Sequence, residues 1–296
     1  MLKGAIAVNK EVGISSQKAV SKVKKLLSGE KVGHAGTLDL EASGVLVVLI
    51  GKATRISDYI MNQGKEYIAT IKFGEKTDTL DYSGKVIAKS EKEISKEEFE
   101  NKLCDFKGEI YQIPPMYSAL KKDGKKLYEL AIEGKSIERK KRKVNIYDIE
   151  LLDFNFPYAK IKVSCSKGTY IRTLADDIGE SLLTYAHLDS LVRTRVGKFL
   201  IEDSIDSSNL SNITKEDIEK HIIPIDRALY NIDSITIDDD LFSKITNGMK
   251  VEYNLEASDK IYKIYCKKEF IGLGIIEKNN GKNLLRMKKV FYDKRN

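Results

Sequence analysis

The apolar run VLVVLI at residues 45–50 is the feature that most constrains the fold, because it holds six consecutive apolar residues and ends at Gly51. A run of this length bounded by glycine is typical of a strand buried on both faces, and such a strand lies inside a covered sheet. Apolar residues make up 42% of the 296 residues, which is enough to build that cover. The sequence therefore predicts an α/β protein built on a mixed sheet.

Periodicity predicts further elements on both sides of this strand. Residues 65–73 and 159–165 alternate between apolar and polar side chains, as half-buried strands do. Residues 16–27 and 171–182 carry apolar side chains at helical spacing. From about residue 232, short strands alternate with turn signals, so the C-terminal end is expected to form a small, mostly β module.

Charge and cysteine content narrow the function classes. The chain has 51 basic and 44 acidic residues, a balance compatible with a polyanionic partner. Its three cysteines, Cys104, Cys165 and Cys266, are widely separated, which argues against a disulfide framework and a structural zinc site. There is no apolar stretch of membrane-spanning length and no signal-peptide pattern, so a cytoplasmic protein without a membrane partner is expected.

The loop before the apolar run, GHAGTLDLEASG, concentrates polar groups among small residues. It carries His34, Asp39 and Glu41. An aspartate in such a loop commonly bonds its own backbone in a turn, and a lone histidine is commonly structural. Asp39 and Glu41 could act as an acid–base pair, as in glycosidases, but residues two apart on an extended loop do not face each other across a sugar.

The sequence GVLVVLIGKAT has a superficial likeness to a phosphate-binding P-loop. Six residues instead of four separate Gly44 from Gly51, and Ala53 follows Lys52 where that motif requires serine or threonine. The intervening residues also have the character of a buried strand. We therefore expect no nucleotide cofactor.

Other candidate residues have ordinary structural explanations as well. Tyr67 lies on the apolar face of its strand and could be a core residue with a bonded hydroxyl. Arg172 could pair with Asp176 one helical turn away. The basic run at residues 139–143 is by default a solvated face. Taken one at a time, these residues do not define a function.

Taken together, the motifs resemble the TruB-type tRNA pseudouridine synthases. The resemblance covers most of residues 1–230, with the motifs in the order of that family. The matching segments are VNKEVGISS, VGHAGTLDLEASGVLVVLIGKAT, KEYIATIKFGEKTDTLDYSG, QIPPMYSALKKDGKKLYELAIEG, CSKGTYIRTLADDIG and AHLDSLVRTRVGKF. The remaining residues resemble, less sharply, the small PUA-like module at the C-terminus of bacterial members.

The resemblance implies a domain organisation. Residues 1–231 would form the pseudouridine synthase catalytic domain, with an RNA-clamping insertion at about 75–140, and residues 232–296 a PUA-like RNA-binding domain. The sequence departs from the family at two positions, because Glu11 and Leu40 stand where proline is usual. Proline contributes mainly a fixed φ, so these changes concern the rigidity of a loop and leave the reacting groups in place.

The resemblance also implies a reaction, the conversion of uridine 55 in the tRNA T-loop to pseudouridine. The N1–C1′ bond breaks, the uracil turns, and C5 takes the place of N1, so atoms are conserved and no cofactor or metal is required. By this resemblance Asp39 is the catalytic nucleophile. Arg172 would keep it ionised in a site shielded from water, where burial alone raises the pKa of a carboxyl group. Tyr67 would stack on the flipped base and take part in proton transfer.

Four further residues are expected to bind substrate on the same basis. His34 would enter the space that the uridine leaves, Tyr170 and Leu191 would form pocket walls, and Lys10 would contact the phosphate backbone. The expected partner is the T-loop and stem of tRNA, bound by a monomer. Two alternatives remain open at this point: a guide-directed or other-RNA pseudouridine synthase, and a chaperone that folds tRNA without catalysis.

Overall fold

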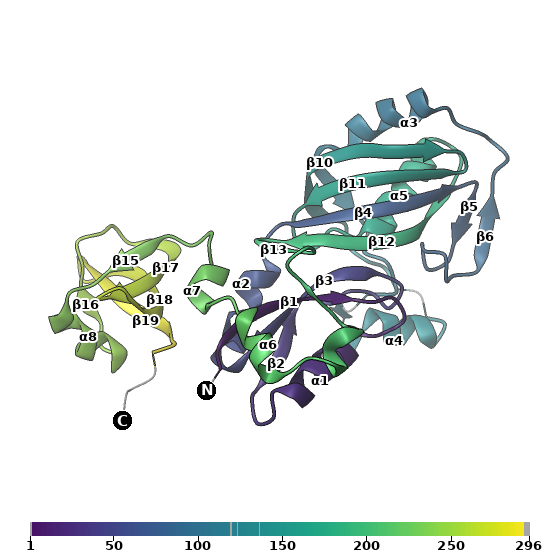
Figure 1. The fold of residues 1–296 in the computed structure, drawn as a ribbon. Helices are drawn as coiled ribbons and strands as arrows, with labels where there is room; N and C mark the ends of the chain where they lie inside the picture. The colour runs from purple at the N-terminus through teal and green to yellow at the C-terminus, as the bar shows by residue number, and fades with distance from the viewer. Residues whose placement is uncertain (1, 119, 123, 136, 293–296) are drawn as a thin grey trace.

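The computed structural model describes residues 2–292 apart from residues 119, 123 and 136. Two sheets organise the chain. A ten-stranded mixed sheet occupies the N-terminal two thirds, and a five-stranded sheet forms a separate module at the C-terminal end (Figure 1). The expectation of an α/β fold on a mixed sheet with a strand-rich C-terminal part is confirmed.

Eight strands of the large sheet pair one after another, and two short strands pair with members of this series. In spatial order the path is β14 (Ile205–Asp206), β1 (Gly4–Lys10), β3 (Ser43–Ile50), β12 (Ala186–Val196), β4 (Lys65–Phe73), β11 (Tyr158–Cys165), β10 (Arg142–Asn155) and β7 (Gly108–Gln112). Strand β2 (Val32–Ala35) pairs with β3, and β13 (Phe199–Leu200) pairs with β12.

Strand β3 lies in the interior of this sheet, as its apolar run predicts. It pairs antiparallel with β1 and parallel with β12, and every residue from Gly44 to Ile50 is buried. Strand β4 shows the predicted alternation, since its burial alternates at every residue from Lys65 to Phe73. Because β12 lies between β3 and β4, it brings the loop before β3 close to Tyr67 on β4.

Helices cover both halves of the sheet. Helix α1 (Ser16–Leu26), capped by the Ser15 side chain, packs on β1 and β3, and α5 (Ile171–Ser181) packs on β4 and β12. Helix α3 (Lys96–Leu103) begins with a capping box formed by Ser95 and Glu98 and covers the far end of the same core. The other helical segments are α2 (Ser57–Met61), α6 (Lys215–Lys220), α7 (Ile225–Ala228) and the 3-10 turns Gly51–Ile56, Cys104–Phe106 and Asn209–Ser211.

Residues 75–140 leave the large sheet and return to it. They form the hairpin β5 (Glu75–Thr77) with β6 (Val86–Lys89), then α3 and β7, and then the hairpin β8 (Lys121–Lys122) with β9 (Lys125–Lys126) and helix α4 (Leu127–Ile132). Figure 1 shows β5 and β6 projecting beside the upper end of the large sheet.

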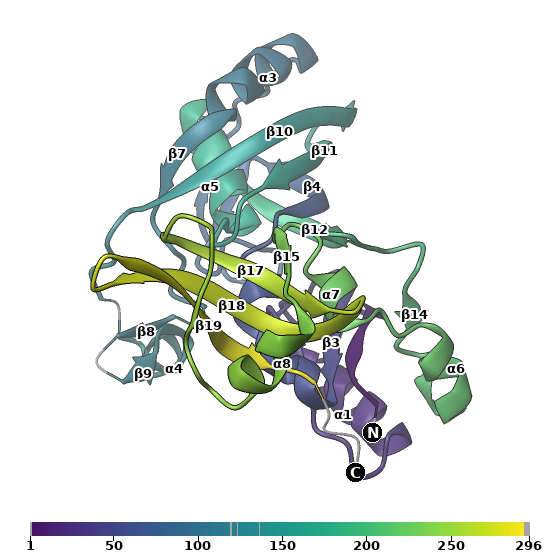
Figure 2. The same cartoon turned by 90° about the vertical axis from the view of Figure 1, so that its left-hand side faces the viewer.

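The C-terminal module is the second sheet, flanked by helix α8 (Asp239–Thr246). Its strands run in the order β15 (Ser234–Thr236), β17 (Ser258–Cys266), β18 (Glu269–Asn279), β19 (Lys282–Val290) and β16 (Val251–Glu252). In Figure 2 this sheet faces the viewer in front of the large sheet.

The module is docked on the rest of the chain by an apolar contact. Phe291 and Leu273 are fully buried in one cluster with Ile56, Ile60 and Leu229. A guanidinium N–H of Arg55 donates a hydrogen bond to the carbonyl of Val290 at 2.8 Å. The end of β19 is therefore part of the core of the preceding sheet.

Within the described residues, no helix is both long enough and apolar enough to cross a membrane.

The docking contact yields a stability prediction. Phe291→Ala should destabilise the docked arrangement by about 3–5 kcal/mol, because the ring is buried between the two parts of the chain. Limited proteolysis should then cut the chain near residue 232 much faster than in the wild type. Tyr230→Ala, which truncates a half-exposed ring beside the same connection, is the matched control. Equal cleavage rates for the wild type and Phe291→Ala would contradict the docking described here.

Candidate active site

Asp39 lies on the loop between β2 and β3 and forms an ion pair with the first turn of α5. Its Oδ2 is 2.9 Å from a terminal nitrogen of Arg172. The two side chains differ in burial, since Arg172 is 7% exposed and Asp39 is 48% exposed. The predicted neighbour is therefore in place. The expectation of a solvent-shielded carboxylate is not met, because Asp39 lies at the mouth of the site in this structure.

Backbone and side-chain oxygens around Arg172 hold its guanidinium in one position. It donates to the carbonyl of Tyr117 at 2.8 Å and to the carbonyl of Thr79 at 3.3 Å. It also contacts Oδ2 of Asp81 at 3.4 Å. These acceptors come from two separate segments of residues 75–140, so this stretch of the chain helps to orient the group that faces Asp39.

The alternative pairing of Arg172 with Asp176 is wrong. Asp176 instead pairs with Lys76, whose ammonium nitrogen is 2.9 Å from Oδ1. The Arg172 guanidinium instead makes tertiary contacts with Asp39, Asp81 and the carbonyls of Thr79 and Tyr117.

Asp81 is a member of the site that the sequence reading missed. Its Oδ1 accepts hydrogen bonds from the Thr79 hydroxyl at 2.7 Å and from the Ser83 hydroxyl at 2.6 Å, while Oδ2 faces Arg172. Leu80, which lies between Thr79 and Asp81, has a φ of 65°, so the chain turns sharply there. The dense TDTLDYSG pattern of turn-forming residues was a signal of a fixed loop, but it did not reveal the distant arginine.

A small cavity opens beside the ion pair. Its volume is about 110 Å³, below the roughly 300–1,000 Å³ of pockets that enclose drug-sized ligands. This size suits a single planar ring. The lining comprises Thr37, Leu38, Asp39, Tyr67, Thr169, Tyr170, Ile171, Arg172, Leu191 and Arg193. The structure thus brings together five of the residues singled out in the sequence: Asp39, Tyr67, Tyr170, Arg172 and Leu191.

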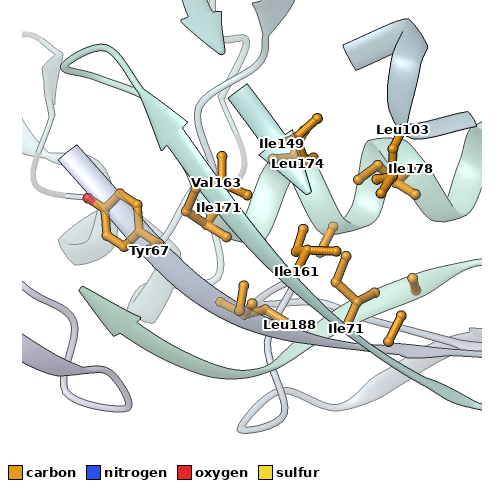
Figure 3. Close-up of a cluster of buried hydrophobic side chains, with 14 of the residues drawn as sticks. Tyr67, Ile71, Leu103, Ile149, Ile161, Val163, Ile171, Leu174, Ile178 and Leu188 are labelled. Carbon is orange, nitrogen blue, oxygen red and sulfur yellow. The ribbon is translucent and has the colours of Figure 1, made fainter. Parts of the chain in front are cut away.

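Tyr67 lies on the buried face of β4, as the alternating pattern predicted, and its hydroxyl points out of the apolar cluster. Its ring ends the buried cluster between β4 and α5, and Figure 3 shows its oxygen directed away from the other labelled side chains. Burial raises the pKa of Tyr67 to about 12, although the neighbouring Arg193 guanidinium acts in the opposite direction. The phenol therefore stays protonated at neutral pH.

Tyr170 and Leu191 form walls of the same cavity. Tyr170 is the residue before α5, and the side-chain amide of Gln112 both accepts from its N–H at 3.0 Å and donates to its carbonyl at 3.2 Å. Burial also raises the pKa of Tyr170. Leu191 is buried on β12, directly opposite Ala69 of β4. Both side chains are thus placed by the large sheet and its helix.

Three residues from separate elements fix the loop that carries Asp39. Arg193 on β12 donates to the carbonyls of Gly36 at 3.2 Å and Thr37 at 3.3 Å. The Ser16 hydroxyl accepts from the N–H of Leu38 at 2.9 Å and donates to its carbonyl at 3.0 Å. The loop is held before Asp39 by these bonds, and it is held after Asp39 by Lys10.

Lys10 corrects an expectation, because it does not reach the surface. Its side chain is fully buried, and its ammonium group donates to the carbonyls of Glu11 at 2.8 Å, Ile14 at 2.9 Å and Leu40 at 3.5 Å. The lysine at the end of β1 therefore supports the loop that carries Asp39, and its ammonium group is not exposed to a phosphate. Burial lowers the pKa of Lys10 to about 8.

His34 lies on β2, outside the cavity lining. It is half-buried, and its Nδ1 has no hydrogen-bond partner among the residues that the structure describes. Burial, followed by the nearby Arg193 charge, lowers the pKa of His34, so the ring is neutral at neutral pH. The structure does not bring His34 to the ion pair.

No group of three or more His, Cys, Asp or Glu side chains able to hold a metal ion occurs in the part of the chain that the structure describes. The polar groups that converge here are a carboxylate, two guanidinium groups and two phenols. Such a set can position a planar base, hold an anionic nucleophile and exchange protons.

Comparison with solved structures gives the class of fold. The chain aligns with a chain of a Cbf5–Nop10–Gar1 complex with a TM-score of 0.75 and 28% identity, covering 98% of this chain and 85% of the other. It also aligns with a chain of an H/ACA RNP bound to a substrate RNA containing 2′-deoxyuridine, with a TM-score of 0.74 and 25% identity, covering 98% of this chain and 85% of the other. The architecture is thus shared with a chain of a Cbf5–Nop10–Gar1 complex and a chain of an H/ACA RNP.

Sequence comparison gives the family. Residues 24–171 match the family model described as TruB family pseudouridylate synthase (N terminal domain), and residues 172–230 match the tRNA pseudouridylate synthase B C-terminal domain. A tRNA pseudouridine synthase B of Clostridium kluyveri is 42% identical over 93% of this chain and 96% of its own length. The tRNA pseudouridine synthase B of Clostridium tetani is 46% identical over 92% of this chain and 95% of its own length. The chain belongs to the TruB family of pseudouridylate synthases.

The buried Lys10 yields a pH prediction. Between about pH 8 and the ordinary lysine pKa near 10.5, the unfolded chain holds a proton on Lys10 that the folded chain has released. The contribution of this residue to the free energy of unfolding therefore rises with pH over that interval. Denaturant unfolding of the wild type and of Lys10→Met, which cannot titrate, should show the wild type gaining stability relative to the variant from pH 7.5 to 10. A constant difference would contradict the burial of a charged Lys10.

Proposed function

We propose that the protein isomerises uridine 55 in the T-loop of tRNA to pseudouridine. The observation that carries the proposal is the ion pair of Asp39 and Arg172 at the mouth of a cavity that suits one pyrimidine ring. The curated relatives support tRNA as the substrate, because they carry the name tRNA pseudouridine synthase B and match along nearly their whole length. They favour tRNA over a guide-directed RNA target.

In this proposal Asp39 is the nucleophile. A carboxylate can act as a nucleophile without a general base to remove a proton from it. The guanidinium of Arg172 faces one of its oxygens and is itself fixed by three further acceptors, so it can hold the carboxylate toward the cavity. The N1–C1′ bond of the uridine breaks and a bond from C5 to C1′ forms, while C5 loses a proton and N1 gains one, so that atoms balance.

Tyr67 and Leu191 would hold the detached uracil. Base–aromatic contacts are worth about 1–3 kcal/mol each, which offsets part of the cost of taking the uridine out of its stack. The phenol of Tyr67 remains protonated because its pKa lies at about 12. It can therefore donate a proton or a hydrogen bond during the turn of the base, with Tyr170 on the other side of the cavity.

Bound RNA would supply the shielding that Asp39 lacks in the free protein. Nearly half of the Asp39 side chain faces solvent here, whereas its partner Arg172 is buried. A nucleotide that enters the cavity covers this open side, so water leaves the site when the substrate arrives. His34, a neutral residue of β2 just before the loop that carries Asp39, would then occupy the space left in the RNA.

The domain organisation belongs to the same proposal. Residues 1–231 form the catalytic part, with the insertion at about 75–140 contacting the RNA, and residues 232–296 act as a PUA-like RNA-binding module. The basic run at 139–143 would contact phosphates, although Arg139 also donates to the carbonyl of Pro114 and Lys143 pairs with Glu109. In the same proposal, the protein acts as a monomer on the T-loop and stem of tRNA.

The test uses an unmodified tRNA transcript and the purified full chain. The wild type should form pseudouridine at the T-loop position. Asp39→Asn should lower the single-turnover rate by at least 10³-fold, because the amide keeps the shape but loses the anionic nucleophile. Binding of tRNA by this variant should remain within a few-fold of the wild type.

Two outcomes would contradict the proposal. Product at another position, or none at all, would refute the assignment of uridine 55, and bound tRNA without product would favour a folding role. An Asp39→Asn rate near that of the wild type would remove Asp39 from the chemistry. Asp153→Asn is the matched control, since it neutralises an exposed carboxylate on β10 outside the 110 Å³ cavity.

A further inference from the structure

Tyr82 is an exposed aromatic residue beside the catalytic pair with no role in the reaction described above. It directly follows Asp81, which contacts Arg172, and its side chain is 47% exposed. The sequence motif TDTLDYSG places it in the turn between β5 and β6. Its ring therefore stands on the face of the protein where the RNA must approach Asp39.

Both ends of Tyr82 are held. Its N–H donates to the carbonyl of Leu188 at 2.9 Å, and the N–H of Leu188 donates back to the carbonyl of Leu80 at 3.0 Å. The phenol donates a hydrogen bond to Glu41 on the catalytic loop. The ring is thus exposed but constrained, so a ligand that stacks on it loses little additional side-chain freedom.

Tyr82 lies at a shallow hollow continuous with the catalytic cavity. The hollow has a volume of only about 10 Å³, so it is a platform and cannot enclose a ring. Asp39, Arg172 and Leu191 line both this hollow and the 110 Å³ cavity. When one base enters the cavity, the neighbouring nucleotide therefore comes to lie over the hollow.

The charges of the hollow select the part of the nucleotide that can bind there. Glu41, Asp81 and Asp189 all line it, and its one cation, Arg172, already faces Asp39 and Asp81. A phosphate group would meet like charge at short range. The flat face of a nucleobase has no such penalty and matches an exposed aromatic ring.

We propose that Tyr82 is a stacking platform for the nucleobase next to the uridine that enters the cavity. The inference rests on the proposed function, since it requires an RNA whose target base is extracted at Asp39. Glu41 acts as a positioning residue that holds the Tyr82 ring upright. The contact contributes to binding and orientation of the RNA, and it takes no part in bond breaking.

The experiment compares variants on a stem-loop RNA that contains the target uridine. Tyr82→Ala should weaken binding about 5- to 100-fold, the range expected for loss of one base–aromatic stack. Tyr82→Phe, which keeps the ring, should bind within about threefold of the wild type. Tyr158→Ala is the matched control, because that tyrosine is 41% exposed and lies opposite Lys72, five residues along β4 from Tyr67.

A double-mutant cycle identifies the base. The same RNA is prepared with an abasic site on the 5′ or on the 3′ side of the target uridine. One of these RNAs should bind the wild type and Tyr82→Ala equally, since the stacking partner is missing from both complexes. The proposal is overturned if the wild type and Tyr82→Ala bind the intact RNA with equal affinity. It is also overturned if Tyr82→Ala loses the same factor in affinity on the intact RNA and on both abasic RNAs.

The failure of this inference differs from the failure of the proposed function. If the wild type forms pseudouridine while Tyr82→Ala behaves as the wild type, only the role of Tyr82 is refuted. If the wild type forms none, the proposed function is refuted, and the binding cycle still reports whether Tyr82 contacts a base.

Discussion

The ion pair between Asp39 and Arg172 is the interaction on which the rest of the site depends. A buried guanidinium is costly unless every face finds an acceptor, and here the acceptors come from the catalytic loop, from Thr79 and Asp81, and from Tyr117. The hydrogen bonds and ion pairs of this one guanidinium therefore hold together three segments that are far apart in the sequence. Their convergence leaves the cavity between α5 and β12 and directs the carboxylate toward it.

Hydrogen bonds fix the chain at Leu40 and Glu11, the two positions where the resemblance to the family leads us to expect proline. Lys10 and the N–H of Gly13 both donate to the carbonyl of Leu40, so this residue is fixed through its oxygen. Glu11 donates its N–H to the Ser207 hydroxyl at 3.0 Å, a bond that proline could not make, and its carboxylate pairs with Lys22. The two departures from the family pattern thus have local structural roles.

Features set by local sequence could be predicted, and features set by long-range contacts could not. The burial of β3, the alternation of β4 and the capping box at Ser95 follow from short-range patterns, and all are present.

The burial of Lys10 could not be read from the sequence, because its carbonyl partner Leu40 lies 30 residues away and comes within reach only when β1 meets the loop. Asp81 was missed for a similar reason, since 91 residues separate it from Arg172. The resemblance to a family supplied the partner of Arg172, while helical spacing alone suggested Asp176.

The most direct test of this account is the single-turnover rate of Arg172→Lys with tRNA at saturating concentration. Lysine keeps the positive charge, but its single ammonium group cannot face Asp39, Asp81 and the two carbonyls in the fixed geometry of a guanidinium. The account predicts a rate at least tenfold below the wild type with an unchanged tRNA dissociation constant. A rate equal to that of the wild type would show that charge alone suffices and would contradict the central place given to this ion pair.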